Sequence, residues 1–383
     1  MKRPKIKYFS YRGCPEPDRQ RDNSPAADTK IDYIIEVLNR IGYDVDHISR
    51  AQSTIDQYIP SYVEKNGNNT YRYFASFGKT KSFLRIFNRW FMELQFFGWC
   101  LFNIKRNEKV LVYHSLGYDS AFIKLKKLKN IHIIGDIEEI YQDVSKQKPS
   151  KERDEYRFID ICDKYMFSNT ILNERLNNRN KPYLVVHGIY RINEYEPISY
   201  NDGKIHILYA GTYDPNKGGA LISVKVAKYL NDNYHLHITG FGSSKQAEEI
   251  RVEVERVKAF TKCDITFHGY LNNIDFLDLM HHCSIGLCTQ DPTSLLNLTS
   301  FPSKILNYMA NGLVVLTGRN RAIMESAVAD LVYYYDEQKP EDIARGIVTI
   351  VNPQGYECRE RLIKLNADFE NELKNILAHE LTK

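Results

Sequence analysis

The chain has no long hydrophobic run. No uninterrupted apolar stretch approaches the ~20 residues that span a bilayer, and the basic start, Met1 to Lys7, lacks the apolar core of a signal peptide. We therefore expect a cytoplasmic protein that is soluble or attached to the inner face of a membrane.

Cysteine is also sparse. The seven cysteines are scattered and odd in number, and no two have C-x-x-C spacing. This pattern argues against a disulfide framework and against a cysteine zinc site. A reducing compartment is the simplest interpretation. Internal repeats of 20–50 residues are absent as well, which argues against a solenoid or propeller.

Two halves of the chain alternate strand-like and helix-like segments, which predicts parallel sheets of the α/β class. The polar stretch 191–203, which contains Pro197 and ends in Asn-Asp-Gly, reads as a linker between them. We predict an N-terminal domain at 1–192 and a C-terminal domain at 203–356. A last helix, 357–383, is expected to pack back on the N-terminal domain.

The first half is predicted to contain a polar loop with several prolines and arginines between its first strand and an amphipathic helix. Gly42 fits the end of that helix. The predicted strands are 6–10, 109–113, 131–134 and 183–186; the loop is 11–29, with Arg12, Arg19 and Arg21, and the helix spans Ile31 to Ile41.

The second half repeats this alternation. Its predicted strands are 205–209, 236–239, 265–267, 284–287 and 313–316, with helices at 219–230 and 357–381.

A glycine-containing turn follows the strand 205–209. Gly211 and Thr212 come directly after this strand, and Lys217 and Gly218 precede the next helix. Such a turn presents backbone N–H groups and a helix N-terminus, which suits a phosphate. The turn is neither a Walker loop nor a full G-x-G-x-x-G, so on its own it is weak evidence.

A second basic helix start lies at 300–312. Pro302 fits the first helical position and Gly312 fits the stop. Ser303 and Lys304 then lie in the first turn, and Asn307 shares a face with Lys304. A lysine at the positive end of a helix is unfavourable unless an anion lies nearby. This segment therefore predicts an anion site, although an unliganded surface lysine is the plain alternative.

Taken together, the segments of 205–325 resemble the C-terminal domain of glycosyltransferase family 4, the glycosyl transferases group 1. The matching motifs occur in the family's order. They are Tyr-Ala-Gly-Thr with Lys-Gly at 209–218, Thr-Gly-Phe-Gly at 239–242, Phe-His-Gly-Tyr-Leu at 267–271, the block 301–312, and Glu325. The N-terminal half resembles the family only loosely.

The resemblance implies a GT-B architecture, with two Rossmann-like domains facing across a cleft. The donor would lie on the C-terminal domain and the acceptor on the N-terminal domain. It implies that a diphosphate is held by Gly211, Thr212, Lys217, Gly218, Ser303 and Lys304. It also implies that the nucleoside meets Gly240, Gly242, Gly269, Tyr270, Leu271 and Asn307.

The chain departs from the family at one pair of positions. Many members have two glutamates eight residues apart, where this chain has Thr299 and Asn307. Asn307 can hydrogen-bond a ribose hydroxyl but adds no charge. The departure leaves open whether the sugar is transferred with retention or inversion, and whether the chain is catalytically active at all.

Polar residues also follow two predicted strands of the first half, where open α/β sheets bind ligands. His114 follows one strand, and Asp136, Glu138 and Glu139 follow another. We predict that His114, Asp136 and Glu138 are catalytic, deprotonating an acceptor hydroxyl or steadying the departing phosphate. A helix N-cap for Asp136 and a satisfied polar side chain for His114 are the plain alternatives.

Positive charge and aromatic residues gather in the first half. Residues 1–190 contain 32 Lys and Arg against 23 Asp and Glu, a net charge of +9, whereas the remainder has 20 against 25, a net of −5. The stretch Lys79 to Arg106 carries eight aromatic side chains and six basic ones beside a single acid, Glu93. This mixture suits a helix lying on anionic lipid, or a core helix with snorkelling basic ends. No nucleic-acid-binding module accompanies it.

We therefore predict a glycosyltransferase that moves a hexose-type sugar from a nucleotide diphosphate sugar, with a UDP-sugar favoured, to a glycan or lipid-linked acceptor. Surface polysaccharide assembly of the bacterial type is the expected setting. No cofactor and no metal are expected, since lysines and a helix N-terminus can stabilise the leaving diphosphate. We find no D-x-D metal motif in the sequence, which agrees with this expectation. An epimerase of the same fold and a non-catalytic sugar-nucleotide-binding subunit remain the alternatives.

Overall fold

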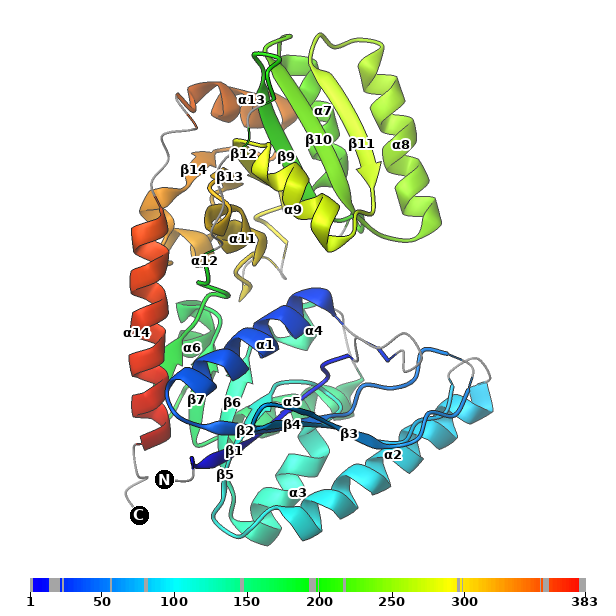
Figure 1. Cartoon of the computed structure of the whole chain (residues 1–383), viewed down its shortest axis with the longest axis vertical. Coiled ribbons are helices and arrows are strands. Elements are labelled where there is room, and N and C mark those ends of the chain that lie inside the picture. Colours follow the sequence, from blue (N-terminus) through cyan, green and yellow to red (C-terminus); the bar gives the residue numbers. More distant parts are fainter. Residues whose placement is uncertain are drawn as a thin grey trace. The chain divides into compact units, whose positions relative to one another are not determined.

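A computed structural model describes residues 3–13, 21–22, 24–55, 57–78, 82–144, 148–192, 198, 200–215, 218–294, 297, 299–351, 353 and 358–378. The chain divides into two compact units (Figure 1). The first comprises Met1–Val186 and Asp368–Lys383, and the second comprises His187–Ala367. Each unit is built around a sheet of its own.

The first unit contains an eight-stranded sheet with the order β3-β4-β2-β1-β5-β6-β7-β8. Neighbouring strands are parallel, except that β3 and β4 form an antiparallel pair. The strands are β1 (Lys5–Ser10), β2 (Asp44–Ser49), β3 (Tyr62–Asn66), β4 (Asn69–Tyr73), β5 (Lys109–Tyr113), β6 (His132–Ile137), β7 (Lys164–Phe167) and β8 (Tyr183–Val185).

Helices cover both faces of this sheet, as the strongly apolar strands require. One face packs on apolar residues of α2, α3 and α5, including Phe96, Phe122 and Phe158. Figure 1 shows α1 on the opposite face. The helices are α1 (Pro25–Arg40), α2 (Ser82–Asn103), α3 (Asp119–Lys129), α4 (Tyr141–Val144), α5 (Pro149–Ile161) and α6 (Thr170–Leu176).

The end of the C-terminal helix α14 (Arg359–Ala378) belongs to the first unit. Phe369 stacks on Tyr33 of α1, with ring centroids 5.8 Å apart. The Lys164 ammonium, at the start of β7, donates to the Ile376 carbonyl at 2.6 Å, and the Lys109 ammonium donates to the Leu377 carbonyl at 2.7 Å. Two lysines of the sheet therefore satisfy carbonyls in the last turn of this helix, where backbone acceptors are otherwise free.

The second unit contains a six-stranded, fully parallel sheet with the order β11-β10-β9-β12-β13-β14. Its chain order reverses between β9 and β12, so β9 lies where a doubly wound sheet binds ligands. The strands are β9 (Ile205–Thr212), β10 (Tyr234–Phe241), β11 (Asp264–Gly269), β12 (Ile285–Cys288), β13 (Val314–Gly318) and β14 (Tyr333–Tyr335).

One face of this second sheet packs on α7, α8 and α13, which contribute Val224, Val254 and Ile347 to its core. The helices of the unit are α7 (Ala220–Val226), η2 (Ala227–Tyr229), α8 (Ser244–Lys258), α9 (Asn273–His281), α11 (Lys304–Ala310), α12 (Arg321–Met324), η3 (Ala329–Leu331) and α13 (Pro340–Thr349). Among the described helices, none combines the length and the apolar character that crossing a bilayer requires.

The α/β class and the two parallel sheets are confirmed, while several element boundaries were wrong. The first helix begins at Pro25 rather than Ile31, because residues 25–30 include no large apolar side chain and so show no apolar period. The loop predicted at 11–29 is correspondingly shorter. The helix predicted from Pro302 begins at Lys304, with Ser303 as its N-cap. The expected stop at Gly42 is confirmed by its φ of 97° directly after the C-cap of α1.

Candidate active site

The turn after β9 is held by one tyrosine. The buried Tyr209 hydroxyl donates to the Thr212 carbonyl at 3.1 Å and accepts from the Gly219 N–H at 3.0 Å. A Cβ on Gly219 would lie 2.0 Å from the Thr289 carbonyl oxygen, so only glycine fits there. The turn therefore brings the end of β9 against the start of α7.

Lys304 reaches this turn from α11. Its ammonium lies 4.4 Å from the centroid of the Tyr209 ring and 2.7 Å from the point where a Cβ on Gly211 would stand. Within the described part of the chain, Lys304 forms no ion pair. The structure thus places the Lys304 ammonium beside Gly211, and both are predicted diphosphate residues.

The position of α11 depends on Tyr308. The Tyr308 hydroxyl is buried and accepts from the Ala210 N–H at 2.8 Å. Its ring lies so close to Gly286 of β12 that a Cβ there would stand 2.4 Å from Cδ2. Tyr308 therefore ties α11 to two strands and fixes Lys304 one turn earlier. Neither Tyr209 nor Tyr308 was identified from the sequence as a site residue, although both occur within the matching motifs.

The predicted nucleoside residues also lie at carboxyl ends of neighbouring strands. Gly240 has a φ of 157°, and a Cβ there would stand 1.7 Å from the Gly211 carbonyl oxygen. Gly242 follows β10 directly before α8, and Gly269, with a φ of 67°, ends β11. Tyr270 is 76% exposed, and Leu271 after it is half-buried.

Asn307 is exposed on α11, one turn after Lys304. Its backbone carbonyl accepts from the Asn311 side chain at 2.8 Å. Thr299, at the place of the family's other glutamate, is buried. Glu325 pairs with Arg321 at 2.6 Å. Ser303 is exposed, Thr212 and Gly218 are half-buried in the turn, and Lys217 lies outside the described residues.

The catalytic candidates of the first unit form two environments. Asp136 is fully buried in β6 and accepts from the Tyr8 hydroxyl at 2.7 Å. Burial, reinforced by the nearby Glu138 carboxylate, raises the pKa of Asp136 to about 8. Glu138 pairs with the ammonium of Lys30, which also donates to the Val186 carbonyl at 3.1 Å. The structure thus places Asp136 next to Glu138, and Glu138 is paired with Lys30, a lysine that the sequence reasoning missed.

His114 belongs to the other environment. Its ring is buried and stacks on Phe158 with centroids 5.8 Å apart and an interplanar angle of 6°. Burial lowers the pKa of His114 to about 4, so the imidazole is neutral near pH 7. Because Phe158 lies in the core beneath α2, α3 and α5, His114 points to the opposite face of the sheet from Asp136 and Tyr8. The structure does not bring His114 to the two carboxyl groups.

Two other sequence expectations concern this unit. The D-x-D spacing does occur, at Asp44 and Asp46, so the statement that no such motif is present was wrong. Both residues lie in the first half of β2, away from its carboxyl end, and the Thr70 hydroxyl donates to Asp46. Arg12, in the loop predicted at 11–29, is part-buried and donates to Asp32 at 2.6 Å and to the Tyr73 hydroxyl at 2.7 Å.

Comparisons with known proteins identify the family and the fold that the chain resembles. Residues 192–368 match the family model described as Glycosyl transferases group 1. No curated protein matches the chain by sequence.

Several solved structures match nearly the whole chain. The OtsA apo structure is 12% identical, with a TM-score of 0.67 over 99% of this chain and 100% of that chain. A structure from E. coli described as trehalose-6-phosphate bound with UDP-2-fluoro glucose is 11% identical, with a TM-score of 0.65 over 97% and 98%. Anabaena Alr3699/HepE in complex with UDP and glucose is 10% identical, with a TM-score of 0.58 over 97% and 100%. At these identities the likeness establishes the fold.

The fold is therefore GT-B, with two Rossmann-like domains. The second unit carries a domain of the glycosyl transferases group 1, and the chain is a nucleotide-sugar-dependent glycosyltransferase.

Replacing the lysine at the glycine turn tests the donor site. We expect Lys304→Ala to lower kcat/KM by roughly 10²- to 10³-fold, because a preorganised cation beside a leaving diphosphate is worth about 2–4 kcal/mol in the transition state. Steady-state kinetics at limiting and saturating donor measure the change. Lys245→Ala, on the exposed first turn of α8, is the matched control and should be unchanged. Wild-type kinetics for Lys304→Ala would contradict the assignment.

The buried carboxyl predicts a pH dependence of stability. The pKa of Asp136 is raised by folding, so Asp136 stabilises the fold below its unfolded pKa of about 4 and loses that contribution as pH rises through about 8. The free energy of unfolding of the wild type should therefore fall, relative to that of Asp136→Asn, between pH 4 and pH 8. Urea unfolding across this range measures the difference. A difference independent of pH would show that Asp136 is ionised in the folded protein.

Proposed function

We propose that the chain transfers a hexose from a UDP-sugar to a glycan or lipid-linked acceptor in surface polysaccharide assembly of the bacterial type. The observation that carries the proposal is the Lys304 ammonium beside Gly211 at the carboxyl end of β9. Similar structures that name UDP-2-fluoro glucose or UDP in their descriptions support the choice of nucleotide.

The donor site would act by stabilising the negative charge of the leaving diphosphate. Lys304, joined by Lys217, would neutralise the diphosphate as it leaves, and N–H groups near Gly211, Thr212, Gly218 and Ser303 would add hydrogen bonds. Such a site needs no metal ion to stabilise the leaving group. The open backbone at Gly240, Gly242 and Gly269, with Tyr270 and Leu271, would receive the nucleoside. Asn307 would hydrogen-bond the ribose.

On the acceptor side, Glu138 is the strongest candidate for the base. It is partly exposed and ion-paired with Lys30, so it can take a proton from an acceptor hydroxyl. Asp136 is buried and its raised pKa keeps it largely protonated at neutral pH, which suits a positioning role through Tyr8. His114 is neutral and enclosed by aromatic side chains, so we assign it a positioning role as well.

One alternative has an observation in its favour. Buried Thr299 and uncharged Asn307 replace the two glutamates typical of the family. A sugar-nucleotide-binding subunit without turnover would tolerate this loss, because Lys304 and the glycine turn suffice to hold a diphosphate.

A donor screen tests the proposed activity. The chain is incubated with UDP-, GDP- and ADP-sugars while thermal stability and nucleotide release are measured. We expect UDP-sugars to raise the Tm by mass action, UDP to be released when an acceptor is present, and Asn307→Ala to weaken UDP binding. Isomerised donor would identify an epimerase, and binding without release would identify a binding subunit. Absence of any UDP effect would overturn the nucleotide assignment.

Helix α2 suggests where the acceptor is met. Ile86, Trp90 and Leu94 are spaced four residues apart and are 71%, 65% and 53% exposed. Arg85 and Arg89 are exposed on the same helix. The helix face opposite this stripe packs in the core through Met92 and Phe96. An exposed apolar stripe flanked by arginines matches the interface of an anionic membrane, which would localise the protein peripherally at the inner membrane face.

Vesicle binding tests this surface. We expect co-sedimentation with anionic vesicles at low salt, weakened at high salt because the electrostatic part is screened beyond about 8 Å at physiological ionic strength. The double variant Ile86→Ser/Trp90→Ser should bind less at either salt concentration. Phe260→Ser, which removes a 75% exposed aromatic side chain from the second unit, is the control. Equal co-sedimentation with anionic and neutral vesicles at low salt would contradict the membrane proposal.

A further inference from the structure

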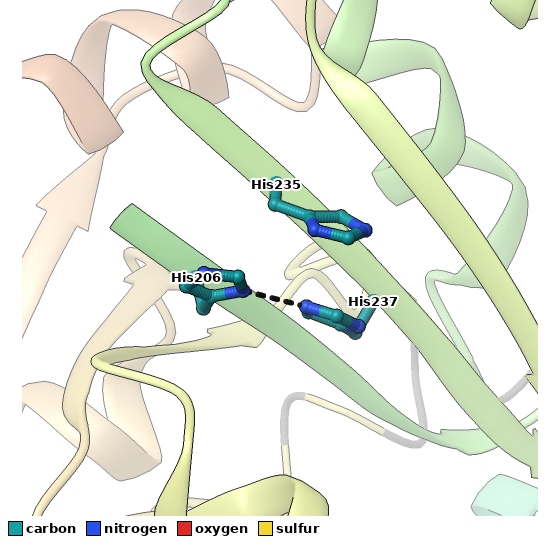
Figure 2. A group of neighbouring side chains, drawn as sticks. All are labelled: His206, His235 and His237. Carbon is teal, nitrogen blue, oxygen red and sulfur yellow. Dashed lines mark hydrogen bonds between the residues drawn. The ribbon is translucent and has the colours of Figure 1, made fainter. Parts of the chain in front are cut away.

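A cluster of histidines lies on three adjacent strands of the second sheet. His206 comes from β9, His235 and His237 from β10, and His268 from β11. His206 and His237 are buried, and the other two are half-buried. Figure 2 shows His235 stacked over His237, with ring centroids 4.1 Å apart, and His206 pointing toward His237. One nitrogen from each of His206, His235 and His237 lies within 4.8 Å of the other two.

The two buried rings face each other through a single pair of atoms. His206 Nδ1 lies 2.9 Å from His237 Nε2. Three nitrogens bound to one tetrahedral zinc ion stand about 3.3 Å apart, given Zn–N bonds of about 2.0–2.1 Å. The distance between these two nitrogens would therefore need to increase by only a few tenths of an ångström for both to bind one ion.

In each of the three rings, the nitrogen that would not bind the metal ion contacts a neighbouring polar group. His206 Nε2 lies 3.1 Å from Asp202 Oδ1, His237 Nδ1 lies 2.9 Å from His268 Nε2, and His235 Nε2 lies 2.8 Å from Thr266 Oγ1. Metal-binding histidines commonly donate their second N–H to a carboxylate or another outer partner, which fixes the tautomer and the ring orientation. The Asp202–His206 pair has this form.

Burial keeps His235, His237 and the adjacent His268 in the neutral form. Burial lowers the pKa of His237 to about 2, and burial lowers the pKa values of His235 and His268 as well. Neutral imidazole is the ligand form, so an ion would displace no proton from His235 or His237 at neutral pH.

We propose that His206, His235 and His237 bind one divalent transition-metal ion of the zinc type. Imidazole nitrogens suit Zn²⁺, Cu²⁺ and Ni²⁺ and disfavour Mg²⁺ and Ca²⁺, which take oxygen ligands. Because the His235 ring is half-buried, it gives the ion access, and its Nδ1 is the nitrogen left to bind the ion, since Nε2 lies against Thr266 Oγ1.

Protons balance when the ion binds. Without metal, a consistent arrangement places the proton of His206, His237 and His268 on Nε2. His268 then donates to His237 Nδ1, His237 donates to His206 Nδ1, and His206 donates to Asp202. With metal, His237 Nε2 becomes a ligand and the proton of His237 resides on Nδ1, donating to His268 Nε2. His268 then carries its proton on Nδ1, so every ring remains neutral and no proton leaves the cluster.

The cluster is distinct from the donor site. His206 and His235 are the second residues of β9 and β10, whereas Gly211 and Gly240 lie near the carboxyl ends of the same strands. Tyr200 covers the cluster: its ring lies tilted against His206 and stacks on His282, with centroid distances of 4.3 and 4.2 Å. A metal here would link β9 and β10, whose carboxyl ends carry Gly211 and Gly240, and would stabilise the second unit by mass action.

Metal titration of the whole chain tests the proposal. After dialysis against a chelator, isothermal titration with Zn²⁺ should show one site per chain, and Co²⁺ should give the visible absorption of a nitrogen-ligated ion. His235→Gln and His237→Gln should each abolish that site. Asp202→Ala should weaken it about 10- to 100-fold through the lost outer partner. His132→Gln, which changes a half-buried histidine of the first sheet, is the matched control.

The outcomes separate cleanly. Supporting results are one zinc per chain in the wild type and in His132→Gln, its loss in His235→Gln, and a Tm raised by Zn²⁺ only where the site is intact. If His237→Gln fails to fold, which circular dichroism will report, the half-buried His235 variant decides. No stoichiometric Zn²⁺ binding by the wild type, or undiminished binding by folded His235→Gln, would overturn the proposal, whatever the glycosyltransferase assays give.

Discussion

The second unit depends on one hydrogen bond from a helix side chain to a strand backbone. The buried Tyr308 hydroxyl accepts from the Ala210 N–H, where β9 has already lost its regular neighbour on one side. Leaving such a buried N–H unsatisfied costs about 1–3 kcal/mol. The bond therefore also fixes the position of α11 along β9, and this sets the position of Lys304, which lies on the same helix.

Glycines without side chains allow the ends of β9 and β10 to approach each other closely. At Gly240 the chain passes within 1.7 Å, measured from a hypothetical Cβ, of the Gly211 carbonyl oxygen. No side chain can enter, so the ends of β9 and β10 stay in contact and their backbone groups stay uncovered. The first unit is arranged differently: Lys30 pairs with Glu138, while the neighbouring buried Asp136 carboxyl holds a proton instead of a charge.

Much of the second unit was predictable because its signals are local. The glycines of the turn, the start of α11 and the ends of the strands each depend on neighbours in sequence. Four of the five strands predicted there either lie within an observed strand or are shifted from it by one residue. The pairing of Lys30 with Glu138 was not predictable, since 108 residues separate them. The face to which His114 points depends on Phe158, and the histidine cluster depends on the register of β9 with β10. Such pairings arise from tertiary packing, which one sequence without aligned relatives does not encode visibly.

The assignment of α14 to both units has a consequence for biosynthesis. The first unit begins at the N-terminus, yet Tyr33 finds Phe369, and Lys164 finds the Ile376 carbonyl, only when the last residues of the helix are present. Domains usually fold in the order in which they leave the ribosome. Here the part of the chain made first is the part completed last. The nascent first unit must wait with an apolar surface of α1 uncovered while the whole second unit is translated.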